Sequence, residues 1–299
     1  MSKKRYSFDN VGHCLPIGGQ SIWSTFSSDM SFADSKPIIL VNSKFDGNAL
    51  IRDSAYGASM KSGVAAVLGI MDALSAFQVQ IQSFSKSIVF TSFDAESWSF
   101  SGSEKFVEDL VSPFTCRNSN DGGGCPIKGA ACSEPCKSTL DYKNINFDMI
   151  ESIIDFDTVG NPLTNRTLFL HVDNQDLNTG NLTSQFEVLG DPISTNGSTA
   201  YINLLPASEN RRLPPTPAMA FLKRKKIPTI VISDYLNEFS NKFLETEFDN
   251  GDSWNATSIE VICGLATLTA KRLYSLASGI SLPLVPTSLK ANCTLVISA

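Results

Sequence analysis

Apolar residues along this chain follow two patterns, short runs typical of strands and longer segments with helical spacing. The runs predict buried strands over 37–41, 87–93, 149–156, 167–172 and 227–233. Helical spacing predicts helices over 58–77, 103–110, 178–189, 215–225 and 258–277. Strands that alternate with helices indicate an α/β fold with a mostly parallel, twisted sheet and helices on both faces.

The alternation begins after a lead-in segment, 1–36, and extends over one domain, 37–280. A last segment, 281–299, is expected to lead into further sequence. A stretch rich in glycine and cysteine, 112–140, interrupts the pattern and is expected to be a surface insertion. Its cysteines, which show no Cys-x-x-Cys spacing and so favour disulfides over zinc, are Cys116, Cys125, Cys132 and Cys136.

Four cysteines allow three pairings, and the sequence does not choose among them. The total of seven leaves at least one cysteine free or paired outside the chain. Cys263 lies in an apolar helical run, where a disulfide and a buried thiol are equally good interpretations.

Charge and targeting signals narrow the class of protein. A net charge of -6 and a pI near 5.0 argue against a nucleic-acid partner, whose phosphates require a basic surface. No apolar run approaches the roughly 20 residues that span a bilayer, and no apolar stretch follows the basic start as in a signal peptide. Five Asn-x-Ser/Thr sequons nevertheless favour a piece of a longer secretory glycoprotein; they are Asn165, Asn181, Asn196, Asn255 and Asn292.

Polar residues follow several predicted strands at the point where each strand ends. They lie in segments 44–46, 57–59, 94–97, 155–157 and 233–235. Ligand sites in α/β sheets form at the carboxyl ends of strands. A two-zinc peptidase needs histidines and carboxylates there, with a free carboxylate as general base.

The order and spacing of these segments resemble those of cocatalytic zinc aminopeptidases, with most ligands replaced. The positions that the resemblance assigns to metal ligands are Lys44, Asp46, Ser59, Ser97, Asp157 and Tyr235. Only Asp46 and Asp157 keep a ligand of the family, and Lys44 would repel a cation. Two carboxylates alone would hold calcium only weakly. The sequence therefore predicts an aminopeptidase-like fold with no catalytic residue, no metal and no cofactor.

Further segments resemble the nicastrin family, the glycoprotein subunits of γ-secretase. They are 14–19, 21–24, 96–103, 214–226 and 235–243, and the likeness extends over about 14–291. The resemblance implies a non-catalytic subunit on the lumenal or extracellular side of a membrane complex, in a longer single-pass protein. Its implied partners are presenilin, the other γ-secretase membrane subunits and the short ectodomain stubs of type I membrane proteins such as Notch.

The resemblance also suggests a substrate contact. Glu96 corresponds to the family glutamate proposed to meet the substrate amino terminus, and Trp98 and Phe100 are further candidates. A helix-start carboxylate that accepts backbone N–H groups is an equally good interpretation of Glu96. Ser99 and Phe100 stand where the family has an Asp-Tyr pair, which puts any role of that tyrosine in doubt.

Two other functions fit the same frame. The first is an active metallo-aminopeptidase with a rearranged metal site. The second is a binding ectodomain like the protease-like domain of the transferrin receptor.

Overall fold

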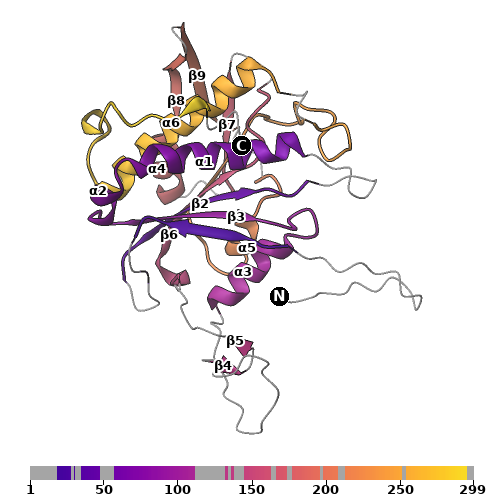
Figure 1. Ribbon diagram of the computed structural model, residues 1–299, viewed down its shortest axis with the longest axis vertical. Helices are drawn as coiled ribbons and strands as arrows, with labels where there is room; N and C mark the ends of the chain where they lie inside the picture. Colours follow the sequence, from indigo (N-terminus) through magenta and orange to yellow (C-terminus); the bar gives the residue numbers. More distant parts are fainter. Residues whose placement is uncertain are drawn as a thin grey trace.

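The computed structural model describes residues 19–27, 30, 35–47, 57–111, 132–133, 136–137, 145–162, 166–173, 177–195, 198–207, 213–250 and 254–294. An eight-stranded sheet in the order β1-β3-β2-β6-β10-β7-β9-β8 forms its centre (Figure 1). The strands are β1 (Ile22–Thr25), β2 (Ile38–Lys44), β3 (Ser87–Phe93), β6 (Ile150–Phe156), β7 (Thr167–His171), β8 (Val188–Thr195), β9 (Ser198–Pro206) and β10 (Thr229–Ser233), with a separate ribbon of β4 (Cys132–Ser133) and β5 (Cys136–Lys137). Pairs β2–β3, β2–β6, β6–β10 and β7–β9 are parallel.

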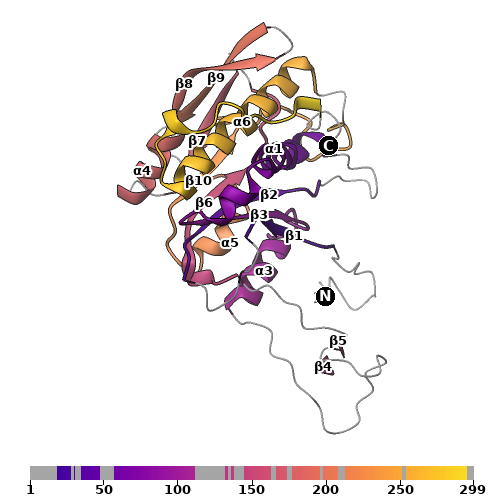
Figure 2. The same cartoon turned by 60° about the vertical axis from the view of Figure 1, so that its left-hand side comes forward.

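Helices cover both faces of this sheet. They are α1 (Ala58–Ser75), α2 (Gln78–Gln82), α3 (Ser101–Val111), α4 (Leu177–Phe186), α5 (Ala218–Leu222) and α6 (Ala256–Ser278). Figure 2 shows α1 and α6 on one side of the strands and α3 and α5 on the other. The α/β fold class expected from the sequence is therefore confirmed.

The two-sided burial of β2 explains its continuous apolar run. Ile39 and Val41 pack into the cluster beneath α1 and α6, whereas Ile38 and Leu40 pack into the cluster beneath α3 and α5. Successive side chains of a strand point to opposite faces, so a central strand covered by helices needs apolar residues at every position.

The structure corrects two predicted helices and adds three strands to the main sheet; the helix predicted over 215–225 is limited to Ala218–Leu222. The helix predicted over 178–189 ends at Phe186, and Val188 and Leu189 already belong to β8. Pairing with β9 outweighs the helical spacing there. The hairpin β8–β9 and the edge strand β1 were not predicted, and β1 brings the lead-in segment into the sheet beside β3.

The carboxyl-terminal part of the chain is attached to α6 by a disulfide between Cys263 and Cys293. Val285 and Leu289, in the segment between them, are buried in the core. The disulfide interpretation of Cys263 is therefore the right one.

The other predicted disulfides stay untested. Cys116 and Cys125 lie outside the described residues. The backbone of Cys132 and Cys136 lies in the β4–β5 ribbon, and their side chains are outside the described part.

Three predicted glycosylation sites, Asn181, Asn255 and Asn292, are exposed, while Asn165 and Asn196 lie outside the described residues. Of the helices in the described part of the chain, none combines the length and hydropathy needed to cross a membrane.

Candidate functional site

Four neighbouring strands end at the same edge of the sheet, and this brings the polar segments together. In the parallel register, Lys44 lies opposite Phe93, and Ser43 lies opposite Phe156. Helix α1 starts at this edge and packs closely on β6: a Cβ on Gly63 would lie 2.6 Å from the Phe156 carbonyl oxygen. Residues that follow β2, β3, β6 and β10 therefore gather at the edge where α1 starts.

An ion pair occupies the centre of this edge. The Lys44 Nζ lies 2.7 Å from Asp157 Oδ1, and both side chains are almost fully buried. The Tyr235 hydroxyl donates a 2.6 Å hydrogen bond to Asp157 Oδ2. Burial alone would lower the pKa of Lys44, but the charge and the hydrogen bond of Asp157, together with the charges of Asp155 and Glu245, outweigh it, so the pKa lies above its usual range. Burial and the same carboxylate raise the pKa of Tyr235.

A second cluster surrounds Ser59 in the first turn of α1. Its hydroxyl donates to Asp249 Oδ1 at 2.8 Å, and its backbone N–H donates to the same carboxylate at 3.1 Å. The Asn241 amide donates to the Ser59 hydroxyl oxygen at 2.7 Å. Gly57, at φ 60°, turns the chain into α1 in a conformation that favours glycine. Asp249 thus caps α1 from 190 residues away.

Glu96 is 3% exposed and is bound to the start of α3. Its two oxygens accept hydrogen bonds from the Ser103 backbone N–H at 2.7 Å and from the Ser103 hydroxyl at 2.8 Å. Burial raises its pKa to about 7, although the Ser103 contacts oppose the shift. These contacts are those of a helix-start carboxylate, and a contact with substrate stays a prediction.

The turn that carries Glu96 is strained. Ala95, Ser99 and Phe100 have φ values of 62°, 59° and 56°, in the left-handed region that costs side-chain-bearing residues roughly 1–3 kcal/mol each. Trp98, at the tip of the turn, is 55% exposed, whereas Phe100 is half-buried. The three substrate-contact candidates therefore differ: only Trp98 presents most of its side chain to solvent.

The remaining ligand positions join the turn to β2. The Ser97 backbone N–H donates to Asp46 Oδ2 at 2.9 Å. The structure thus brings all six sequence-predicted ligand positions to one edge, but in separate contacts: Lys44 with Asp157 and Tyr235, Asp46 with Ser97, and Ser59 with Asp249.

Buried acids outnumber buried bases at this edge. Among the described residues the buried acids are Glu96, Asp155, Asp157, Asp234 and Asp249, and Lys44 is the one buried lysine or arginine. Burial raises the pKa of Asp155 to about 7 and that of Asp234 to about 6. Asp155 accepts the Ala218 N–H at the start of α5 at 2.9 Å. N–H groups at helix starts and the raised pKa values thus offset the negative charge that the single ammonium group of Lys44 does not neutralise.

The contacts of Asp157 decide whether the site suits a zinc pair. One oxygen pairs with an ammonium group and the other accepts the tyrosine hydroxyl. A cation placed between Asp157 and the Ser59 position would face the positive charge of Lys44 at close range. Among the described residues no three His, Cys, Asp or Glu side chains lie close enough to hold one ion. The donor set does not fit zinc.

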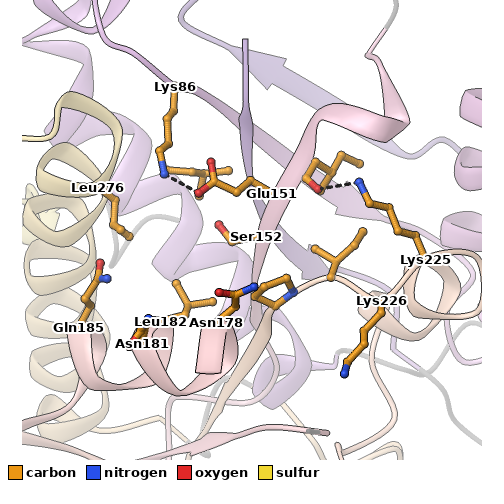
Figure 3. Close-up of a pocket in the computed structure, with 14 residues that line it drawn as sticks. Lys86, Glu151, Ser152, Asn178, Asn181, Leu182, Gln185, Lys225, Lys226 and Leu276 are labelled. Atoms are coloured by element: carbon orange, nitrogen blue, oxygen red, sulfur yellow. Dashed lines mark hydrogen bonds and ion pairs between the residues drawn. The ribbon is translucent and has the colours of Figure 1, made fainter. Parts of the chain in front are cut away.

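Open pockets lie elsewhere on the described surface. A pocket of about 440 Å³ lies at the opposite edge of the sheet, near the start of β6. Figure 3 shows Lys86 pointing to Glu151 on one side of it and Lys225 and Lys226 on the other. A more apolar pocket of about 450 Å³ lies between β1 and α1. Neither is lined by Lys44, Asp157 or Tyr235.

Asp249 and Asn241 were missed in the sequence because they lie in a polar stretch without periodicity. One signal existed: the first turn of α1 contains no acidic residue of its own, so its N–H groups need an acceptor from elsewhere. His171 is 3% exposed and bonds to the Ser233 hydroxyl at 2.9 Å and to the Tyr235 carbonyl oxygen at 3.0 Å, so it lies next to one of the ligand positions.

Comparisons with known proteins place this geometry in a family. A family model described as the nicastrin large lobe matches residues 37–276. The nicastrin of Dictyostelium purpureum is 33% identical over 250 residues, which cover 81% of this chain and 36% of that protein. A crystal structure titled as the γ-secretase component nicastrin superposes with a TM-score of 0.74 at 27% identity, covering 94% of this chain and 46% of that one.

The LapA aminopeptidase of Legionella pneumophila is more distant. It superposes with a TM-score of 0.53 at 16% identity, covering 90% of this chain and 58% of LapA. Identity this low shows a common fold and nothing more. The chain spans about two fifths of the length of the curated relatives it matches, between 36% and 41%.

Proposed function

The chain belongs to the nicastrin family, and from this premise we propose that it forms the large lobe of a non-catalytic ectodomain that controls access to an intramembrane protease. The observation that carries the proposal is the Lys44–Asp157 ion pair, closed by the Tyr235 hydroxyl. An ammonium group attached to the chain replaces the metal charge, yet it can neither polarise a peptide carbonyl as zinc does nor activate a water molecule.

The proposed mechanism is selection by size. The lobe stands on the lumenal or extracellular side of a γ-secretase complex that includes presenilin and the other membrane subunits. Short stubs of type I membrane proteins, such as those of Notch, pass beneath it, and bulky ectodomains collide with it. This role needs a rigid body and no chemistry, which agrees with a core buried on both sides of the sheet.

A substrate contact at Glu96 would require the loss of hydrogen bonds that this carboxylate already accepts. The carboxylate would have to give up one or both Ser103 hydrogen bonds before pairing with a substrate ammonium group. Trp98 is the side chain of this turn that a substrate would meet without any rearrangement, since it is 55% exposed. We therefore assign Trp98 the first contact and Glu96 a second one.

The test compares substrates of graded ectodomain length in the complex assembled with the full-length protein. Stubs should be cleaved, and the same stubs fused to a folded domain should not. Glu96→Ala and Glu96→Lys separate a direct contact from steric selection, because size dependence should survive both. Cleavage that is independent of ectodomain size would overturn the proposal.

The two rival functions have their own tests. Metal analysis and release of amino acids from short peptides address the aminopeptidase: two tightly held zinc ions with peptide hydrolysis would establish it. Co-purification with presenilin separates the proposed subunit from a free-standing receptor ectodomain.

A further inference from the structure

The segment that follows β10, residues 234–250, supplies the side chains that close the site. None of its residues lies in a helix or strand, yet Asp249 is 0% exposed and Tyr235 is 6% exposed. Tyr235 binds Asp157 at the strand ends, while Asn241 and Asp249 bind Ser59 at the start of α1. The segment thus contacts both sides of the position that the zinc pair would occupy in an aminopeptidase.

The segment is held in shape by its own hydrogen bonds. The Asn241 side chain accepts the Phe243 N–H at 2.9 Å, and the Thr246 N–H donates to the Phe243 carbonyl at 3.0 Å. The Asp249 N–H donates to the Thr246 carbonyl at 3.2 Å. Successive turns therefore bring Asp249 back to α1 in one defined conformation.

Two polar side chains of the segment point inward, while three of its aromatic ones face solvent. Asn241 and Asp249 point into the site, whereas Phe239, Phe243 and Phe248 are 50%, 55% and 61% exposed. A surface loop usually turns apolar side chains inward and polar ones to water. The reversal has a physical reason, because the groups beneath the segment are an amide, a hydroxyl and a carboxylate that need hydrogen-bond partners.

Charge adds to the attachment. The carboxylate of Glu245, in the middle of the segment, is among the groups that raise the pKa of Lys44. Hydrogen bonds to carboxylates, such as those of Asp157 and Asp249, are the stronger kind. The segment is thus attached by carboxylate hydrogen bonds at both ends.

We propose that residues 234–250 are an intramolecular plug that fills the former metal and substrate position, and that a peptide amino terminus reaches the strand-end carboxylates only when Asp249 releases α1. The access part of this proposal rests on the proposed function, since it concerns the peptide that the lobe would select. The plug itself is a property of the fold and can be tested without any substrate.

Hydrogen exchange measured by mass spectrometry on the full-length protein in its complex tests the plug. Asp249→Ala removes the acceptor for the Ser59 N–H and hydroxyl, and Glu238→Ala removes an exposed carboxylate of the same segment as a matched control. We expect peptides over 57–60 and 241–250 to exchange about tenfold faster or more in Asp249→Ala, given the strength of hydrogen bonds to charged groups. Glu238→Ala should leave both unchanged.

Wild-type protein gives a second readout in case the variant does not fold. Amides of 57–60 and 241–250 should become exchangeable together, because one opening event frees both. Independent exchange of the two regions, or an Asp249→Ala variant with unchanged exchange at 57–60, overturns the plug.

The probe for access is a short peptide with a free amino terminus, compared with its N-acetylated form. Asp249→Ala should bind the free peptide at least several-fold better than wild type does and should show no gain for the acetylated one. Faster amide exchange in Asp249→Ala without any gain in peptide binding supports the plug and counts against recognition of the amino terminus. The plug and the proposed recognition can therefore be refuted independently.

Discussion

Lys44 and Ser59 stand at two ligand positions of the aminopeptidase frame, and their surroundings differ in kind. Lys44 brings a positive charge to a carboxylate that stayed in place, Asp157. Ser59 is the opposite case: the first turn of α1 carries no acidic residue, and Asp249 supplies a carboxylate from a distant segment. The site must satisfy both its buried acids and the open helix starts around them.

The comparison teaches that each buried charge has its own compensation. Asp157 has an ammonium partner, Asp249 and Glu96 accept N–H groups in the first turns of α1 and α3, and Asp155 does so at the start of α5. Removal of a compensating partner should lower the free energy of unfolding most where the partner carries a full charge and least where it is a neutral hydroxyl.

Lys44→Met should have the largest effect, because it leaves Asp157 buried without a cation. We expect a loss of about 3–5 kcal/mol in the free energy of unfolding. Urea unfolding of the purified protein measures it. Asp157→Asn added to this variant should recover much of the loss, and a single variant as stable as wild type would contradict the charge argument.

Ser59→Asp tests the other half of the comparison. The change places a second carboxylate beside Asp249 at the start of α1, which should lower the free energy of unfolding by several kcal/mol. Asp249→Ser as a second substitution should restore stability by leaving one acid at the start of α1. If the single variant unfolds like wild type, Asp249 does not carry the charge assigned to it.

Stability should fall as pH rises from about 5 to 7.5. Glu96, Asp155 and Asp234 have pKa values raised to about 7, 7 and 6, so the folded state binds more protons than the unfolded state in this window. Their stabilising contribution is complete below the ordinary carboxyl pKa and is lost through the raised values.

Each of the two groups whose pKa is raised to about 7 should contribute on the order of 2–3 kcal/mol to this change, and Asp234 about half as much, since one pKa unit corresponds to about 1.4 kcal/mol. Tm measured across pH gives the curve. Glu96→Gln should flatten it, and Glu108→Gln, an exposed carboxylate on α3, should not. A Tm that rises toward pH 7.5 would show that the buried acids are not protonated.

Tyr235→Phe should have the smallest effect, about 1 kcal/mol, since it removes a single hydrogen bond and Asp157 keeps Lys44. Urea unfolding beside Lys44→Met gives the ratio of the two losses. Equal losses would mean that the hydroxyl and the ammonium contribute alike, which would remove the distinction between charged and neutral compensation.

The fold was predictable where one rule dominated. Strands such as β2 are buried on both faces, and their unbroken apolar runs locate them in the sequence. The β8–β9 hairpin does not, because Gly190 and Asp191 interrupt its pattern and its stability comes from pairing with β7.

The site was predictable as a set of ligand positions, because the carboxyl ends of parallel strands converge. Its contacts were not predictable. Asp249 reaches Ser59 across 190 residues through irregular chain, and no local pattern specifies such an approach. The hydrogen-bond partner of Glu96 was not predictable either, because it depends on the path of the turn that places Glu96 against Ser103.

The disulfide between Cys263 and Cys293 has a mechanical consequence. A force applied to the chain at Cys293 passes through the sulfur bridge into the amino-terminal half of α6 and bypasses the chain between the two cysteines, which are 30 positions apart. Helix α6 lies against α1, whose first turn holds the site. A force from beyond Cys293 would therefore act on the core helices before it could pull Val285 and Leu289 out of the core. After reduction of the disulfide, the force would act on Val285 and Leu289 first.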